Sequence, residues 1–287
     1  MTRWLHEPLA PGLRRSWLLD EVLWAGDTGF QHVVIARTEQ GVTLFCDGER
    51  QSSELGQLAY HEALLVPALL LAERVERVLV VGSSEGVVSQ LAVAAGARTV
   101  DHVDIDRECV RRCAELLPYG YSAAELAAAE RGDSPVRVHY ADGWDFVAAA
   151  SGFDVIVVDL PDERDNQTAQ HNRLYGVEFL RRCAHAVRDG GVVTSQAGCP
   201  TLWRNAGLLR AWRRFHSVFG TVVYYGSDEH EWAFLSGRPD LVPDPAPRLA
   251  GRLAALPYRP ATLDAPALLA RTLPPLALRR AAGWLTG

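Results

Sequence analysis

The sequence predicts an α/β fold in which a Rossmann-like, doubly wound sheet follows a small N-terminal β region. Through the middle of the chain, short apolar runs rich in β-branched residues alternate with helix-length segments, which is typical of a parallel sheet with crossover helices. The first part of the chain instead alternates in strand fashion, which favours antiparallel strands. We therefore expect an N-terminal β-strand region at 1–57, a Rossmann-like domain at 58–240 and a tail rich in proline, alanine and leucine at 241–287.

Individual elements can be assigned in order along the chain. HVVIART at 32–38 and GVTLFCDG at 41–48 predict an antiparallel pair of strands, and a helix is expected to begin at Gln57. Four apolar runs predict the parallel strands, at 78–81, 99–103, 136–140 and 155–158. Later elements are a helix over 208–219, an antiparallel end of the sheet formed by 221–225 and 231–236, and a linker with the sequence PDLVPDPAP.

Each of the four predicted parallel strands ends in a polar group. The groups are GSSEG at 82–86, VDID at 103–106, ADG at 141–143 and VDLPD at 158–162. Ligands bind beyond the carboxyl ends of parallel strands, so these groups should converge on one crevice. Asp104 lies roughly twenty residues past Gly82, where a carboxylate can bind ribose hydroxyls. The pattern predicts a nucleoside site with chemistry at its far end.

The glycine turn bears on the kind of nucleoside that would bind. GSSEG is not the G-x-G-x-x-G pattern of dinucleotide-binding enzymes. A dinucleotide-binding dehydrogenase is still one interpretation, but Glu85 would repel an anionic pyrophosphate at this turn. A cationic nucleoside is therefore the better match.

Composition excludes several classes of function. The chain contains no lysine, which excludes Schiff-base and pyridoxal mechanisms. Its net charge is −6 and it shows no basic patch interleaved with aromatics, so nucleic acid is not expected as a partner. The five cysteines lack C-x-x-C spacing, which favours reduced thiols over a disulfide framework or a zinc site. With no apolar signal core and no bilayer-length apolar run, we expect a cytoplasmic protein without a membrane partner.

Taken in order, the motifs resemble those of the spermidine synthase (polyamine aminopropyltransferase) family. The resemblance rests on QLAYHEALL at 57–65, the acidic glycine turn, VDID, ADGWDF, and VDLPD followed by LYGVEFL. TGFQ at 28–31 and CDGERQ at 46–51 match the family's S-x-F-Q and L-D-G-x-x-Q patterns, so the likeness extends over roughly residues 25–236. The LPD form of the last motif looks closer to the less characterised bacterial branch. The implied fold is that of class I S-adenosylmethionine-dependent transferases.

The resemblance also implies an activity and a set of site residues. Family members transfer the aminopropyl group of decarboxylated S-adenosylmethionine to a small-molecule amine, release methylthioadenosine, hold no permanent cofactor or metal, and commonly form homo-oligomers. The implied donor-binding residues are Gln31, Gly82, Glu85 (arm ammonium), Asp104 (ribose), Asp142 (adenine amino group) and Gly143. The implied acceptor-side residues are Tyr60, His61, Asp162 and Tyr225. Asp159 is expected to take or relay the proton of the attacking amine.

Departures from the family pattern leave alternatives open. The usual turn is G-G-G-D-G, whereas this chain has Ser83, Ser84 and Glu85. Two added hydroxyls can receive a carboxylate, so methyl or 3-amino-3-carboxypropyl transfer from intact S-adenosylmethionine is an alternative, as is a catalytically weak nucleoside-binding homologue. The usual proline after the second aspartate is Glu163, and Tyr225 matches the family's acceptor-side tyrosine only loosely. The acceptor's identity stays open.

Overall fold

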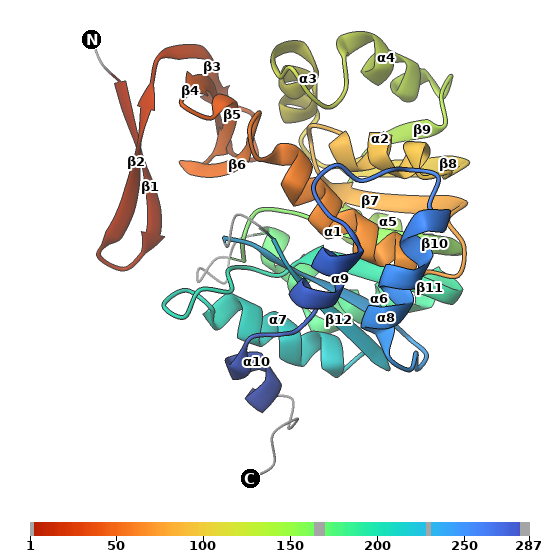
Figure 1. Ribbon diagram of the computed structural model, residues 1–287. Coiled ribbons are helices and arrows are strands. Elements are labelled where there is room, and N and C mark those ends of the chain that lie inside the picture. Colours follow the sequence, from red (N-terminus) through yellow and green to blue (C-terminus); the bar gives the residue numbers. More distant parts are fainter. Residues whose placement is uncertain (1–2, 164–169, 228–230, 282–287) are drawn as a thin grey trace.

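A seven-stranded sheet forms the centre of the protein, whose computed structural model describes residues 3–163, 170–227 and 231–281 (Figure 1). The strand order is β12-β13-β11-β10-β7-β8-β9. The strands are β7 (Arg77–Gly82), β8 (Thr99–Asp104), β9 (Val136–Tyr140), β10 (Phe153–Asp159), β11 (Val187–Gln196), β12 (Thr221–Gly226) and β13 (Ala233–Arg238). The predicted doubly wound sheet is confirmed, and β12 and β13 form its antiparallel end.

The strand order reverses between β7 and β10. On one side β7 pairs with β8, which pairs with β9, and on the other β10 pairs with β11, all in parallel. The register between the two central strands places Asp159 opposite Gly82. Because a crevice opens beyond the carboxyl ends of strands at such a switch point, the two polar groups that end β7 and β10 meet there.

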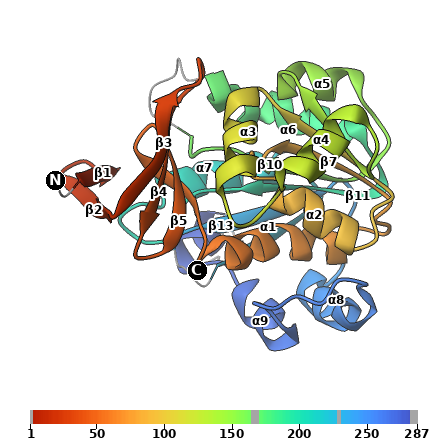
Figure 2. The ribbon, with the colours of Figure 1, turned by 90° about the horizontal axis from the view of Figure 1, so that it is seen from above.

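Helices cover both faces of the sheet because successive side chains of a strand point to opposite faces. Val78 and Val80 of β7 belong to a core built with α1 (Gln57–Leu71), α2 (Val87–Ala94), α3 (Arg107–Leu116) and α4 (Ala123–Arg131). Leu79 and Val81 belong to a second core with α5 (Gly143–Ala149), α6 (Val177–Ala186) and α7 (Ala206–His216). Figure 2 shows α1 and α2 on one side of the sheet and α5 and α6 on the other. The five cysteines are buried and unbridged.

The N-terminal region forms two small antiparallel sheets. β1 (Arg3–Ala10) and β2 (Leu13–Leu19) make a hairpin, while β3 (Glu21–Asp27), β4 (His32–Thr38), β5 (Gly41–Cys46) and β6 (Glu49–Ser53) make a four-stranded sheet. The strand pair predicted from the sequence is β4–β5, and α1 begins at Gln57 as expected. In Figure 1 the hairpin lies beyond the four-stranded sheet, away from the central sheet. The division of the chain into three domains stays a prediction.

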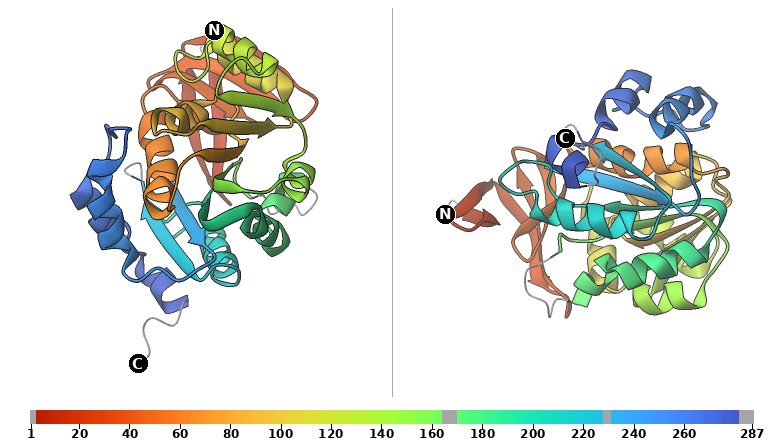
Figure 3. Two further views of the ribbon diagram at one scale, coloured as in Figure 1. Left: turned by 90° about the vertical axis from the view of Figure 1, so that its right-hand side faces the viewer. Right: turned by 90° about the horizontal axis from the view of Figure 1, so that it is seen from below.

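The segment expected to be a linker is helical in part. α8 (Pro245–Arg252) begins inside PDLVPDPAP, because a helix tolerates proline in its first turn, where the missing N–H has no intrahelical acceptor. A 3₁₀ turn (Leu253–Ala255), α9 (Ala265–Arg271) and α10 (Leu276–Ala281) continue the tail. α8 packs against α1, and α9 against β12 (Figure 3). No helix in the described ranges has both the length and the apolarity that a membrane crossing requires.

A buried carboxylate of α1 anchors this tail. Glu62 is fully buried, and its two oxygens accept hydrogen bonds from the Tyr258 hydroxyl, the Ala261 backbone N–H, and both the backbone N–H and the hydroxyl of Thr262. These distances run from 2.5 to 2.8 Å. The donors replace the water that the carboxylate loses on burial. The loop between α8 and α9 is thereby tied to α1 one residue after His61.

Candidate active site

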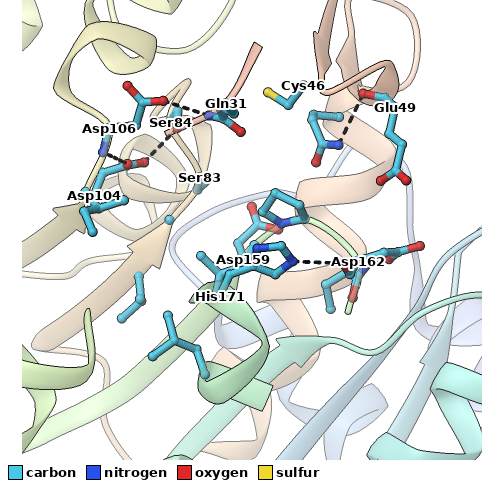
Figure 4. Close-up of a pocket in the computed structure, with 18 of the residues that line it drawn as sticks. Gln31, Cys46, Glu49, Ser83, Ser84, Asp104, Asp106, Asp159, Asp162 and His171 are labelled. Carbon is cyan, nitrogen blue, oxygen red and sulfur yellow. Dashed lines mark hydrogen bonds between the residues drawn. The ribbon is translucent and has the colours of Figure 1, made fainter. Parts of the chain in front are cut away.

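A pocket of about 270 Å³ lies beyond the carboxyl ends of β7, β8 and β10, and the N-terminal strands line it from another side. Sequence-predicted residues that line the pocket are Gln31, Tyr60, Gly82, Glu85, Asp104, Asp142, Gly143, Asp159 and Asp162. In Figure 4, Asp159 lies between Asp104 and Asp162. The structure therefore brings the predicted strand ends together, while the role of each residue stays a prediction.

The glycine turn packs tightly against the end of β10. Gly82 has a φ of 83°, and a Cβ there would lie 2.1 Å from the carbonyl oxygen of Asp159, so only glycine fits. The same carbonyl accepts a hydrogen bond from the Ser83 backbone N–H at 2.9 Å. At Gly143, a Cβ would lie 2.5 Å from Val81 Cγ1. These close contacts fix the turn relative to Asp159.

Asp104 ends β8 in a buried, hydrogen-bonded position. Its Oδ1 accepts from the Asp106 backbone N–H at 2.8 Å, and its Oδ2 accepts from the Ser84 hydroxyl at 2.7 Å. Burial raises the pKa of Asp104 to about 7, and these two hydrogen bonds oppose the rise only in part. Ser84 therefore occupies an oxygen that a ribose hydroxyl would use, so a bound nucleoside has to share or displace that contact.

Asp106 is a pocket residue to which the sequence analysis gave no role. Its Oδ2 accepts hydrogen bonds from the Thr28 hydroxyl at 2.6 Å and from Gln31 Nε2 at 3.0 Å. Its Oδ1 accepts from the Cys109 backbone N–H and so caps α3. Asp106 thereby joins the TGFQ segment to the central domain and orients Gln31. The signal was present in VDID, whose second aspartate directly precedes a helix.

One carboxylate oxygen of Asp142 caps α5, and the other accepts hydrogen bonds from two side chains. Its Oδ1 accepts from the Trp144 backbone N–H at 2.9 Å. Its Oδ2 accepts from Gln170 Nε2 at 3.1 Å and from the guanidinium of Arg173. An adenine amino group at this position would have to share Oδ2 with Arg173, and no local sequence pattern indicates this contact.

Asp159 and Glu85 share a buried network with two residues of α1. The Tyr60 hydroxyl donates to Asp159 Oδ1 at 2.7 Å. His61 Nε2 lies 3.3 Å from Glu85 Oε1 and 3.8 Å from Asp159 Oδ2, while its Nδ1 lies 2.7 Å from the Gln57 carbonyl oxygen. Since a carbonyl only accepts, Nδ1 carries a proton. His61 does not line the pocket and is 1% exposed, so it contacts the two carboxylates from the side facing the protein interior.

The titration of this network follows from its burial and charges. Burial lowers the pKa of His61, but the hydrogen bond and charge of Glu85, with the charge of Asp159, outweigh it and raise the pKa overall. For Glu85, burial raises the pKa, and the contact with His61 outweighs it, so the pKa is lowered. Burial raises the pKa of Asp159, offset only in part by His61 and Tyr60. Glu85 therefore stays charged beside His61, while Asp159 is the better proton acceptor.

Asp162 is engaged on both oxygens. Gln196 Nε2 donates to Oδ1, and the Arg204 guanidinium pairs with Oδ2 at 3.1 Å. Gln196 ends β11, and Arg204 lies between β11 and α7. Both line the pocket, and neither was predicted from the sequence as a site residue. Gln196 was detectable in principle as the polar residue that ends a fifth strand.

Tyr225 does not line the pocket, so its position does not support contact with an acceptor. It is 2% exposed and belongs to the core between the sheet and α1. Side chains alternate along β12, so a pocket position cannot be inferred from a loose motif match alone. Trp232 lines the pocket instead, and its ring centroid lies 5.3 Å from that of Tyr60 in an edge-to-face arrangement.

Comparisons with known proteins identify the family of this chain. Residues 57–225 match the family model described as the spermine/spermidine synthase domain. The polyamine aminopropyltransferase of Aeropyrum pernix is 31% identical over 84% of this chain and 76% of its own length. Polyamine aminopropyltransferase 1 of Hyperthermus butylicus is 31% identical over 76% of this chain and 71% of its own length.

Solved structures agree on the fold. A spermidine synthase in complex with the transition-state analogue AdoDATO superposes with a TM-score of 0.84 at 18% identity, covering 99% of this chain and 97% of that one. The spermidine synthase from Thermotoga maritima gives a TM-score of 0.82 at 17% identity, with the same coverage. The family model, the curated relatives and the shared fold together show that this chain belongs to the spermine/spermidine synthase family, the family of the polyamine aminopropyltransferases.

Proposed function

We propose that this pocket transfers an aminopropyl group from decarboxylated S-adenosylmethionine to an amine acceptor and releases methylthioadenosine. Family membership supports this reaction over methyl or 3-amino-3-carboxypropyl transfer. The observation that carries the proposal is the Asp159 carboxylate, whose side chain is only 9% exposed beside the glycine turn, with the Tyr60 hydroxyl 2.7 Å away. A catalytically weak binding protein would have no use for this arrangement, because an unused buried carboxylate costs stability.

The chemistry is a displacement at carbon. The amine's lone pair attacks the methylene carbon bonded to the donor's sulfonium, so a C–N bond forms while the C–S bond breaks and methylthioadenosine leaves as a neutral thioether. An amine that is protonated in water must first lose a proton. Asp159 accepts that proton, and its raised pKa suits the task. Tyr60 fixes one Asp159 oxygen, so the carboxylate holds the amine in line for attack.

Glu85 has a separate role at the other end of the transferred group. Its carboxylate is 7% exposed, lines the pocket and stays ionised through its contact with His61. In this proposal it binds the terminal ammonium of the aminopropyl arm. A donor that retained its carboxylate would bring a second negative charge to the same place. The side chain therefore selects the decarboxylated donor.

Titrating both donors into the protein tests this selection. We expect decarboxylated S-adenosylmethionine to bind more tightly than the intact form by about 1 to 3 kcal/mol, the usual worth of one charge contact in a partly desolvated site. Glu85→Gln should remove most of that difference. Isothermal titration calorimetry measures the affinities, and mass spectrometry identifies the product. Preference for the intact donor, with a methylated or carboxyaminopropylated product, would contradict the proposal.

The nucleoside half of the pocket should bind its ligand more weakly in acid. Ribose hydroxyls donate hydrogen bonds, so the ionised form of Asp104 is the one that binds them. With a pKa of about 7, its ionised fraction rises from about a tenth at pH 6 to about nine tenths at pH 8. Methylthioadenosine affinity should therefore rise roughly tenfold over this range. Calorimetry at three pH values measures it, Asp104→Asn should show a flat profile, and a flat wild-type profile would exclude this role for Asp104.

Two further properties belong to the same proposal. We infer a homo-oligomer, by analogy with the family, and a cytoplasmic enzyme, because its substrates are small metabolites and its five cysteines carry no disulfide. Size-exclusion chromatography with light scattering measures the first.

A further inference from the structure

The acidic residues that line the pocket differ in their partners. Glu85 contacts His61, Asp104 accepts from Ser84, and Asp106 accepts from Thr28 and Gln31. Across residues 3–163, 170–227 and 231–281, no arginine forms a hydrogen bond or an ion pair with these three acids. These three acids lie on the side of the pocket proposed to hold the cationic donor, where a fourth acid, Asp142, accepts from Arg173.

A second group of pocket acids is neutralised by arginine. Glu231 pairs with Arg15 at 2.6 Å and with Arg50 at 2.8 Å, and Glu7 lies 3.3 Å from Arg15 Nε. Asp162 pairs with Arg204 at 3.1 Å. Figure 4 shows Asp162 on the side of Asp159 away from Asp104. Glu7, Glu231 and Asp162 are therefore already paired with arginine, whereas a second ammonium of a polyamine would need an available carboxylate.

Arg204 retains capacity for another partner. Its guanidinium has five N–H donors, and its side-chain contact among the described residues is the one with Asp162 Oδ2. The side chain lines the pocket and is 24% exposed. Gln196 holds the other oxygen of Asp162, so Asp162 is fixed and in turn orients Arg204. An incoming ammonium would have to break this pair, whereas an incoming carboxylate can bind the remaining donors without breaking it.

We propose that the acceptor carries a carboxylate a few bonds from its attacking amine and that Arg204 recognises this carboxylate. The inference rests on the proposed aminopropyl transfer and specifies its acceptor class as amino acids or amino carboxylates. The amine meets Asp159 and loses its proton there, and the carboxylate lies against Arg204. The reaction's atom balance is unchanged, because the carboxylate takes no part in bond making.

Matched acceptors test the proposal with the unaltered protein. 1,4-Diaminobutane is compared with 4-aminobutanoate, in which a carboxylate replaces the second amine, and with L-ornithine, in which a carboxylate is added. We expect kcat/KM, measured as methylthioadenosine released from the decarboxylated donor, to be at least roughly tenfold higher for one of the carboxylated acceptors. A higher value for the diamine than for both would overturn the inference while leaving aminopropyl transfer intact. Absence of methylthioadenosine with every amine would instead reject the proposed function.

Variants then assign the preference to one side chain. Arg204→Gln should lower the ratio of kcat/KM, carboxylated acceptor over diamine, by roughly tenfold, mainly through KM of the carboxylated acceptor. Arg204→Lys keeps the charge and should retain part of the ratio. Arg210→Gln is the matched control, because Arg210 pairs with Glu163 and does not line the pocket. An equal loss for both acceptor classes in Arg204→Gln would show a structural role and overturn the inference.

Discussion

Replacing Asp159 with asparagine is expected to lower turnover by roughly 10²-fold or more. Asparagine is nearly isosteric and can still accept a hydrogen bond from the Tyr60 hydroxyl, but it cannot take a proton from the amine. Because Asp159 lies opposite Gly82 rather than in the Asp104 network, methylthioadenosine should bind with unchanged affinity. Single-turnover rates with a saturating acceptor measure the loss, and calorimetry measures the binding.

Glu163→Gln is the control for this variant. Glu163 also follows β10 and also carries an altered pKa, lowered against the effect of burial by Arg214 and Arg210. Its side chain does not line the pocket. Its loss should leave the single-turnover rate within a few-fold of wild type. Equal rates for Asp159→Asn and the wild type would make Asp159 structural and require a different proton acceptor.

Replacing Glu62 with leucine is expected to lower the free energy of unfolding by about 3 to 4 kcal/mol. The change leaves the N–H groups of Ala261 and Thr262 and the Tyr258 hydroxyl without their acceptor, the fully buried Glu62 carboxylate. Each hydrogen bond to a charged group contributes about 1.5 to 3 kcal/mol, and partial access of water to the released loop offsets some of the sum. Urea unfolding followed by circular dichroism measures the change.

Tyr258→Phe is the matched control for Glu62. It removes one donor and leaves the carboxylate with its three others, so the expected loss is about 1 kcal/mol. If Glu62→Leu cost no more than Tyr258→Phe, the tail would be held by apolar packing of α8 and α9 rather than by the carboxylate.

The strand ends of the site were predictable because two simple regularities determine them. Apolar runs of four or five residues fix the strands, and parallel pairing brings their carboxyl ends to one edge. Asp104, Asp142 and Asp159 therefore reached the pocket as expected. Spacing from Gly82 also indicated a ribose-binding role for Asp104, whereas the roles of Asp142 and Asp159 came from the family resemblance.

Features that depend on tertiary contacts were not predictable. Tyr225 lies outside the pocket, and a loose motif match does not indicate on which face of the sheet a β12 side chain lies. Arg204 and Arg173 reach Asp162 and Asp142 from segments 42 and 31 residues away in sequence, and no local pattern indicates such pairs. Likewise, the tail reads as proline-rich and linker-like, and its order comes from packing on α1 and from Glu62.

Backbone contacts hold the glycine turn at both of its ends. The carbonyl of Asp159 contacts the turn at Gly82 and Ser83, and the carbonyl of Glu85 accepts the Tyr121 N–H at 2.9 Å, with Gly120 so close that a Cβ would lie 2.0 Å from that oxygen. Contacts between backbone atoms therefore fix the positions of the two residues relative to each other: Glu85, proposed to bind the arm, and Asp159, proposed to meet the amine. How far the arm-binding carboxylate reaches into the pocket then depends on the length of the side chain at position 85. The glutamate here, in place of the family's usual aspartate, extends that reach by one methylene group.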